Sequence, residues 1–278
     1  MGSDTEVGGI QSAILILMKT HRSNSPITVG LFVTCLADLM RPQVAFAAVS
    51  LLEHAQCEVR VPRGQSCCGQ PALNSGDRAN SIEIAKQVIT EFSDVDYVVV
   101  PSGSCADTLK NKYPTLFSKD MRWARRAQKL ADKTWELTKF LFEKVELKGI
   151  DAALDGVCTY HDSCTGLREL SIYEQPRELL KQVKGLRLKE LKDSNVCCGF
   201  GGLFSLKYSD ISTHLVSDKC TEICNSDADM VLGGDLGCLL NIAGRLRRDN
   251  KKARVFHIAE VLAGMTDGPA IGDPEESE

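Results

Sequence analysis

The stretch SCCGQ at residues 66–70 recurs as VCCGF at residues 196–200. Each copy belongs to a set of four cysteines, with gaps of 31 and 36 residues in the first set and 32 and 39 in the second. The two sets are Cys35, Cys67, Cys68 and Cys105, and Cys164, Cys197, Cys198 and Cys238. Chance rarely gives such a repeat, so the sequence predicts two copies of one folding unit, each with four thiols.

Apolar β-rich runs alternate with helical periodicity around both copies. In the first half we predict strands at residues 27–33, 58–61 and 97–100, and helices at 43–54, 77–92 and about 107–112. In the second half we predict strands at residues 156–160, 186–191, 229–232 and 254–257, and helices at 176–183, 210–225 and 238–248. Alternating strands and helices imply right-handed crossovers and a parallel sheet covered on both faces. We therefore expect an α/β fold of two repeated Rossmann-like halves.

The repeat also predicts how the chain is divided. We expect a flexible N-terminal extension at residues 1–26, one repeat at residues 27–118 and the other at residues 151–266. Residues 119–150 carry a long amphipathic pattern and are expected to form a helical bridge that packs between the halves. Residues 267–278 are rich in Pro, Glu and Asp and are expected to be disordered.

Composition limits the classes of protein that fit. The 278 residues are 43% hydrophobic and 25% charged, and the net charge of -4 gives no basic surplus for nucleic acid or anionic lipid. The apolar run at residues 10–18 lacks basic residues upstream and is too short to span a bilayer. We therefore expect a cytoplasmic protein without an integral membrane segment, whose twelve cysteines are thiols or metal thiolates.

The cysteines of each set follow the predicted strands. Open α/β sheets bind ligands beyond the carboxyl ends of their strands, so each set is expected to form one pocket. Four thiolates suit an iron-sulfur cluster or a structural zinc ion, and Gly69 and Gly199 allow the tight turn that a vicinal pair requires. The wide gaps are unlike the short paired spacings of common zinc modules. They favour one iron-sulfur cluster per half, with zinc in one half as the alternative.

A histidine and an aspartate precede the second set at the end of a predicted strand. His161 and Asp162 could move the proton that accompanies an electron, or accept the proton of a substrate hydroxyl, and are candidate catalytic residues. The alternative is a hydrogen bond from His161 to a metal-bound sulfur or to a backbone group.

Five segments carry a resemblance to a known family. They are LFVTCLADLMRPQVA, SCCGQPALNSG, PSGSC, YHDSC and NVCCGFGG. They resemble the lactate utilisation protein A family, within the cysteine-rich CCG-domain proteins that include the cysteine-rich subunit of heterodisulfide reductase and the glycolate oxidase iron-sulfur subunit. The resemblance implies an iron-sulfur subunit of a complex that oxidises L-lactate, a small 2-hydroxy acid, to pyruvate. It also implies two partners, a second iron-sulfur subunit and a third small subunit.

The chain departs from the wider CCG pattern at one position in each half. That pattern ends in Cys-x-x-Cys, and here Ser102 and Asp235 stand in place of the first cysteine of that pair. Four thiolates per site fit an ordinary [4Fe-4S] cluster, with Ser102 and Asp235 as candidate oxygen ligands. Two other functions are a zinc-stabilised scaffold without a redox role and a thiol/disulfide oxidoreductase like heterodisulfide reductase, against which the missing fifth cysteines count.

Overall fold

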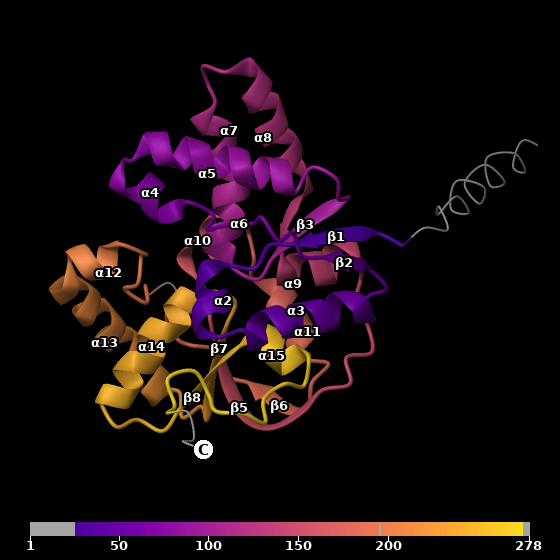
Figure 1. Cartoon of the computed structure of the whole chain (residues 1–278). Coiled ribbons are helices and arrows are strands. Elements are labelled where there is room, and N and C mark those ends of the chain that lie inside the picture. The colour runs from indigo at the N-terminus through magenta and orange to yellow at the C-terminus, as the bar shows by residue number, and fades with distance from the viewer. Residues whose placement is uncertain (1–25, 195, 275–278) are drawn as a thin grey trace, which may run out of the picture.

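The computed structural model of the protein describes residues 26–194 and 196–274. Each half contains a four-stranded, all-parallel sheet, with the strand orders β2-β1-β3-β4 and β6-β5-β7-β8 (Figure 1). The strands are β1 (Thr28–Leu31), β2 (Glu58–Arg60), β3 (Tyr97–Val100), β4 (Thr134–Glu136), β5 (Ala153–His161), β6 (Lys184–Leu188), β7 (Met230–Gly233) and β8 (Arg254–His257). The two orders are the same when counted from the start of each half, which confirms the predicted α/β fold of two repeated halves.

Helical segments connect the strands in both halves. In the first half they are α2 (Cys35–Met40), α3 (Gln43–His54), α4 (Gln70–Ser75), α5 (Arg78–Glu91), α6 (Gly103–Asp107), the π-helical turn η1 (Thr108–Lys112), α7 (Tyr113–Leu116), α8 (Met121–Lys133), α9 (Leu137–Lys139) and the π-helical turn η2 (Phe140–Lys144). In the second half they are α10 (Cys164–Glu169), α11 (Glu174–Leu180), α12 (Phe204–Lys207), α13 (Ser209–Asn225), α14 (Leu236–Arg248) and α15 (Ile258–Leu262). No helix of these described segments is long and apolar enough to cross a membrane.

The central strands are apolar because helices cover both faces of each sheet. Strand β3 reads YVVV, and its three valines are completely buried. Strand β7 reads MVLG and is buried throughout. Such continuous apolar runs are typical of parallel sheets without a solvent-facing side.

The two halves contact each other in a reciprocal way. Helix α2 contacts α14, and its equivalent α10 contacts α6, the equivalent of α14. Helix α3 likewise contacts α15, and its equivalent α11 contacts α9. Equivalent helices therefore make equivalent contacts across the boundary between the halves. This is the arrangement of an isologous dimer, formed here within one chain. One hydrophobic core runs through both halves and includes Leu31, Phe140, Leu232 and Phe256.

Residues 119–150, expected as a helical bridge, contain a strand. Helix α8 ends at Lys133, and β4 then pairs with β3 in parallel, with Val98 opposite Thr134. A three-residue strand is too short to show an alternating pattern, so the helical periodicity around it dominated the prediction. The boundaries at residues 118 and 150 remain a prediction.

The predicted disorder of residues 267–278 is wrong for part of that segment. Ala270 and Ile271 are 2% and 5% exposed, and the Ile271 N–H donates to the Val255 carbonyl at 2.9 Å. Two apolar side chains in a polar segment are sufficient to anchor it against α14 and β8. Residues 275–278, the predicted N-terminal extension up to residue 25 and its apolar run lie outside the described residues.

Candidate metal centre

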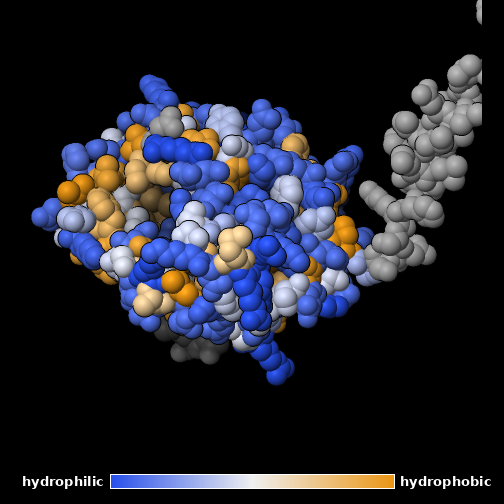
Figure 2. All heavy atoms as spheres, turned by 90° about the horizontal axis from the view of Figure 1, so that it is seen from above, coloured by the Kyte–Doolittle hydropathy of each residue, from blue (hydrophilic) through white to orange (hydrophobic). Residues whose placement is uncertain are grey.

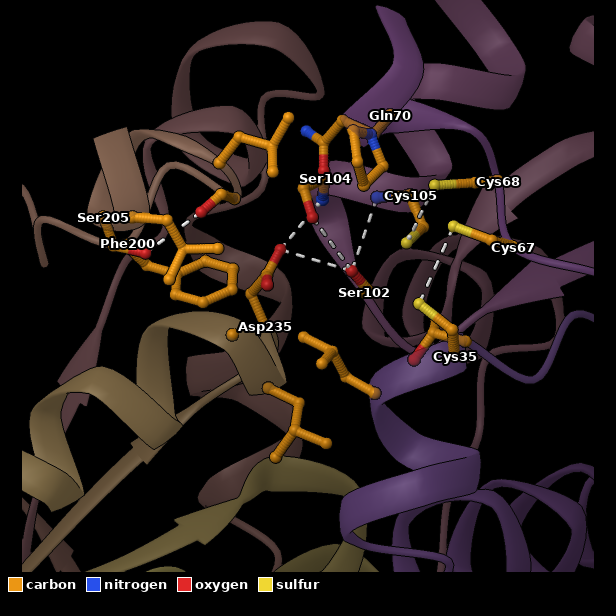
Figure 3. Close-up of a pocket in the computed structure, with 18 residues that line it drawn as sticks. Cys35, Cys67, Cys68, Gln70, Ser102, Ser104, Cys105, Phe200, Ser205 and Asp235 are labelled. Atoms are coloured by element: carbon orange, nitrogen blue, oxygen red, sulfur yellow. Dashed lines mark hydrogen bonds between the residues drawn. The ribbon is translucent and has the colours of Figure 1, made fainter. Parts of the chain in front are cut away.

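The four cysteines of the first set lie together at the carboxyl edge of the first sheet. The Sγ atoms of Cys35 and Cys67 are 3.7 Å apart, and those of Cys68 and Cys105 are 3.4 Å apart (Figure 3). Cys35 begins α2 directly after β1, the vicinal pair follows β2, and Cys105 lies in α6 after β3. The ends of three adjacent strands thus bring sulfurs together that are 70 residues apart in the sequence.

Backbone geometry fixes the first vicinal pair. Gly69 has a φ of 79°, in the left-handed region that glycine adopts without strain, and its N–H donates to the Cys67 sulfur at 3.4 Å. The hydroxyl of Tyr113 is fully buried and donates to the Cys68 carbonyl at 2.8 Å. The turn therefore directs both thiols of the pair toward the other two.

The second set converges in the same manner. The ionisation of Cys164 is coupled to that of Cys197, and that of Cys198 to Cys197 and Cys238. The sulfurs of Cys198 and Cys238 lie within 4.8 Å of each other. Gly199 has a φ of 77°, and its N–H donates to the Cys197 sulfur at 3.3 Å. The structure thus brings all eight predicted cysteines into two sets of four.

A side-chain donor holds the carbonyl of the second vicinal pair as well. The amide of Asn241, on α14, donates to the Cys198 carbonyl at 2.7 Å. Asn241 thus binds the carbonyl of its vicinal pair as Tyr113 does in the first half, although the two residues do not occupy equivalent positions in the repeat. The cysteine pattern gave no sign of either donor, because neither residue belongs to it.

The thiols of each set do not ionise independently. Hydrogen bonds from Cys35 and Cys68 hold the pKa of Cys67 well below its usual range, whereas hydrogen bonding and burial raise the pKa values of Cys35 and Cys68. In the second set, Cys197 has the lowered pKa and Cys198 a raised one, for the same reasons. A thiophilic cation replaces the remaining protons and lets all four sulfurs carry charge. The donor sets therefore fit a metal ion or a metal-sulfur cluster.

His161 lies beside the second set and is 1% exposed. One ring nitrogen of His161 and the sulfurs of Cys198 and Cys238 lie within 4.8 Å of one another. Neither ring nitrogen has a hydrogen-bond partner within the described part of the chain. Burial lowers the pKa of His161 to about 3, so the imidazole is neutral at physiological pH.

Asp162 forms a salt bridge with an arginine. Its two carboxylate oxygens each accept from Arg177, at 2.9 Å and 2.9 Å, and Glu190 binds the same guanidinium at 2.7 Å. Asp162 is 3% exposed, so this bidentate pair is buried. The arrangement uses both carboxylate oxygens to fix the strand end after His161, and a catalytic role of Asp162 stays a prediction.

Ser102 and Asp235 meet each other across the boundary between the halves. The Asp235 Oδ2 atom accepts from the Ser104 N–H at 2.9 Å and from the Ser102 hydroxyl at 3.2 Å (Figure 3). Ser102 also caps α6 by accepting from the Cys105 N–H at 3.4 Å. The two positions that lack the fifth cysteine thus form a polar contact on the approximate two-fold axis, which local sequence could not indicate.

A pocket of about 280 Å³ opens beside the first set of cysteines. The first half contributes all four cysteines of that set, and the second half contributes apolar side chains that face them, together with Asp235. The apolar residues from the second half are Phe200, Leu203, Leu206 and Leu236. None of the second set of cysteines lines this pocket. Figure 2 shows apolar residues gathered around a hollow at the left of the face that it presents.

Comparisons with known proteins agree with this architecture. The family model of the cysteine-rich domain matches residues 29–110 and 158–243, one segment in each half. The chain is 49% identical to lactate utilization protein A of Bacillus cytotoxicus and 47% identical to that of Bacillus cereus strain G9842. Both matches extend over 234 residues, 84% of this chain and 98% of the relative.

A solved structure shares the fold alone. A hypothetical protein from Helicobacter pylori superposes with a TM-score of 0.51 at 11% identity, covering 95% of this chain and 55% of that one. This chain therefore spans just over half the length of that protein. The two-segment match and the level of identity to whole-length relatives show that the chain belongs to the cysteine-rich domain family, among the lactate utilization A proteins.

Proposed function

We propose that the protein is an iron-sulfur electron-transfer subunit of a cytoplasmic complex that oxidises L-lactate, or a related 2-hydroxy acid, to the 2-oxo acid. The observation that carries the proposal is the convergence of two sets of four thiols at equivalent strand ends. The names of relatives at 47–49% identity supply the lactate pathway. An iron-sulfur cluster bound by each set supplies one-electron redox chemistry, and two such centres match the two electrons released per lactate.

The chain's own residues would hold and shape these centres. The eight cysteines are the proposed ligands, and the N–H groups of Gly69 and Gly199 donate to sulfur, which stabilises the more negative, reduced state. Tyr113 and Asn241 keep each vicinal pair in place through its carbonyl. Ser102 and Asp235 bind each other, and in this proposal they join the halves and are not oxygen ligands.

The wall of the pocket, as far as the structure describes it, offers a lactate carboxylate no cationic side chain. Among the described residues that line it there is no Lys, Arg or His, and Asp235 adds a carboxylate. A lactate carboxylate would find no cationic partner there, and anion sites in proteins normally supply one. The proposal therefore assigns hydroxy-acid oxidation to a partner subunit, with a second iron-sulfur subunit and a third small subunit completing the complex.

One observation favours zinc in the second half as the alternative. His161, Cys198 and Cys238 present one nitrogen and two sulfurs within 4.8 Å of one another, a combination that structural zinc sites use. In that case only the first half would be a redox centre, and the second would stabilise the fold.

Anaerobic purification and metal analysis test the proposal. A brown protein with about four irons per centre in both halves is the expected result. Cys68→Ser and Cys198→Ser should each remove the iron of one half, and Cys224→Ser, outside both sets, should leave iron content unchanged. A colourless protein with zinc alone, or unchanged iron in both cysteine variants, would contradict the assignment.

A further inference from the structure

We infer that His161 is a nitrogen ligand of the metal in the second half, so that the two centres have different donor sets. The inference rests on the proposed function in one respect, that the second set of cysteines binds metal. It goes further by naming a protein ligand outside the cysteine repeat. Because a zinc ion or an ordinary cluster takes four protein ligands, His161 replaces one of the four thiolates of the second set, which makes the halves inequivalent.

The first argument is the state of the imidazole itself. Both nitrogens of His161 are buried and without a hydrogen-bond partner among the described residues. An unsatisfied polar group in a protein interior costs on the order of 1–3 kcal/mol, and native structures rarely tolerate one without a functional reason. The sulfurs of Cys198 and Cys238 lie with the imidazole in a group whose ligand atoms are all within 4.8 Å of one another. A bound metal would supply a partner for one of the two nitrogens.

The second argument is that the backbone around His161 is fixed. His161 is the last residue of β5 and pairs with Gly233 of β7, at the edge where the cysteines converge. Asp162 is then clamped by Arg177, and Ser163 caps α10 by accepting from the Gly166 N–H at 3.2 Å. The backbone therefore holds His161 at the edge where the second set of cysteines lies before any metal binds.

The third argument is the comparison with the first half. Phe32 precedes Cys35 by three residues, as His161 precedes Cys164. The Phe32 side chain is fully buried, and its ring packs against Phe92 with the centroids 5.7 Å apart. The same position, three residues before the first cysteine of each set, thus fills an apolar core in one half and places an imidazole beside thiols in the other. Packing alone would be satisfied by phenylalanine in both halves, so the imidazole has a further role in the second.

X-ray absorption at the edge of the bound metal tests the ligand directly. The full chain with Cys67→Ser and Cys68→Ser should load metal only in the second half, whether the metal is iron or zinc. We expect sulfur and imidazole nitrogen in its first shell. Adding His161→Leu should remove the nitrogen contribution, and adding His214→Gln, at an exposed histidine, should leave it unchanged.

Stability separates a ligand from a merely structural histidine. In the metal-free protein, His161→Leu replaces an unpaired polar ring by an apolar side chain and should not lower stability. Metal affinity of the same variant should fall by about 10-fold or more. A sulfur-only metal shell, or unchanged affinity in His161→Leu, would overturn the inference and leave the proposed function intact. A second half that binds no metal at all would overturn both.

Discussion

Glu136→Gln should make the protein more stable at neutral and alkaline pH. Glu136 lies at the end of β4 and is 4% exposed. Its Oε2 atom accepts from the Thr138 hydroxyl at 2.6 Å and from the Lys139 N–H at 3.0 Å, and no ion pair within the described residues includes it. Burial outweighs these two hydrogen bonds and raises the pKa of Glu136 from 4.5 to about 7.

The magnitude follows from proton linkage. The folded protein retains a proton on Glu136 at pH values where the unfolded chain has already released it. The unfolding free energy therefore falls as the pH rises from 4.5 to about 7. Each pKa unit corresponds to about 1.4 kcal/mol, so the shift is worth about 3 kcal/mol. Glutamine keeps an oxygen acceptor and carries no charge, so the variant should lose this part of the pH dependence.

Urea unfolding of the metal-free, reduced protein measures the effect. Wild type and Glu136→Gln should have similar unfolding free energies near pH 4.5 and should diverge by about 3 kcal/mol by pH 8. Glu83→Gln is the matched control, because Glu83 is 71% exposed and its removal should leave the pH dependence unchanged. If wild type and Glu136→Gln lose stability in parallel over this pH range, the reasoning from burial is refuted.

Three further substitutions test how the two centres are supported. Arg177→Met should cost about 3–5 kcal/mol of unfolding free energy, because it leaves the buried Asp162 carboxylate unpaired; a loss below about 1 kcal/mol would contradict the buried pair. Tyr113→Phe removes the donor to the Cys68 carbonyl and should cost about 1–3 kcal/mol, with weaker metal retention in the first half only; equal loss from both halves would speak against it. Gly199→Ala should cost about 1–3 kcal/mol of unfolding free energy, because the new Cβ would lie 2.5 Å from a backbone oxygen of α13 and the residue has a φ of 77°. A melting curve like that of the wild type would contradict this prediction.

The sequence pattern was sufficient to predict the helices and strands whose hydrophobic spacing is regular over several residues. The strands at residues 97–100 and 254–257 and the helix at residues 43–54 were predicted at their observed bounds, because burial and amphipathic spacing define them over several residues. Strand β4 was missed because three residues within a helical pattern carry no periodicity of their own. The convergence of the cysteines followed from their places after strands, which a parallel sheet brings to one edge.

What the sequence could not show depends on the way the halves meet. The contact between Ser102 and Asp235 joins residues 133 positions apart. The pocket beside the first set of cysteines needs side chains from the other half, such as Phe200 and Leu206. Burial of both His161 nitrogens next to sulfur likewise depends on elements of the second half that no motif predicts. Each of these features arises from tertiary packing, whereas sequence patterns report secondary structure and its buried face.

The reciprocal contacts between the halves have different chemistry on the two sides of the approximate two-fold axis. On one side, Arg41 at the end of α2 binds Glu260 of α15 at 2.8 Å. On the other, the equivalent position of Glu260 is Lys139 of α9, which donates to the Leu170 carbonyl at the end of α10 at 2.9 Å. An ion pair on one side and a lysine bound to a backbone carbonyl on the other make the two interfaces chemically different.

The surroundings of the two candidate metal centres also differ. Only the first set of cysteines lines the pocket between the halves, and only the second has an imidazole where its counterpart has Phe32. Two equivalent centres would have equal reduction potentials, so an electron would have no thermodynamic preference for either one. Because ligand type and surroundings set the potential of a metal centre, unequal donor sets give unequal potentials. Under the proposed function, one altered position in a duplicated scaffold would therefore give electron transfer between the two centres a preferred direction.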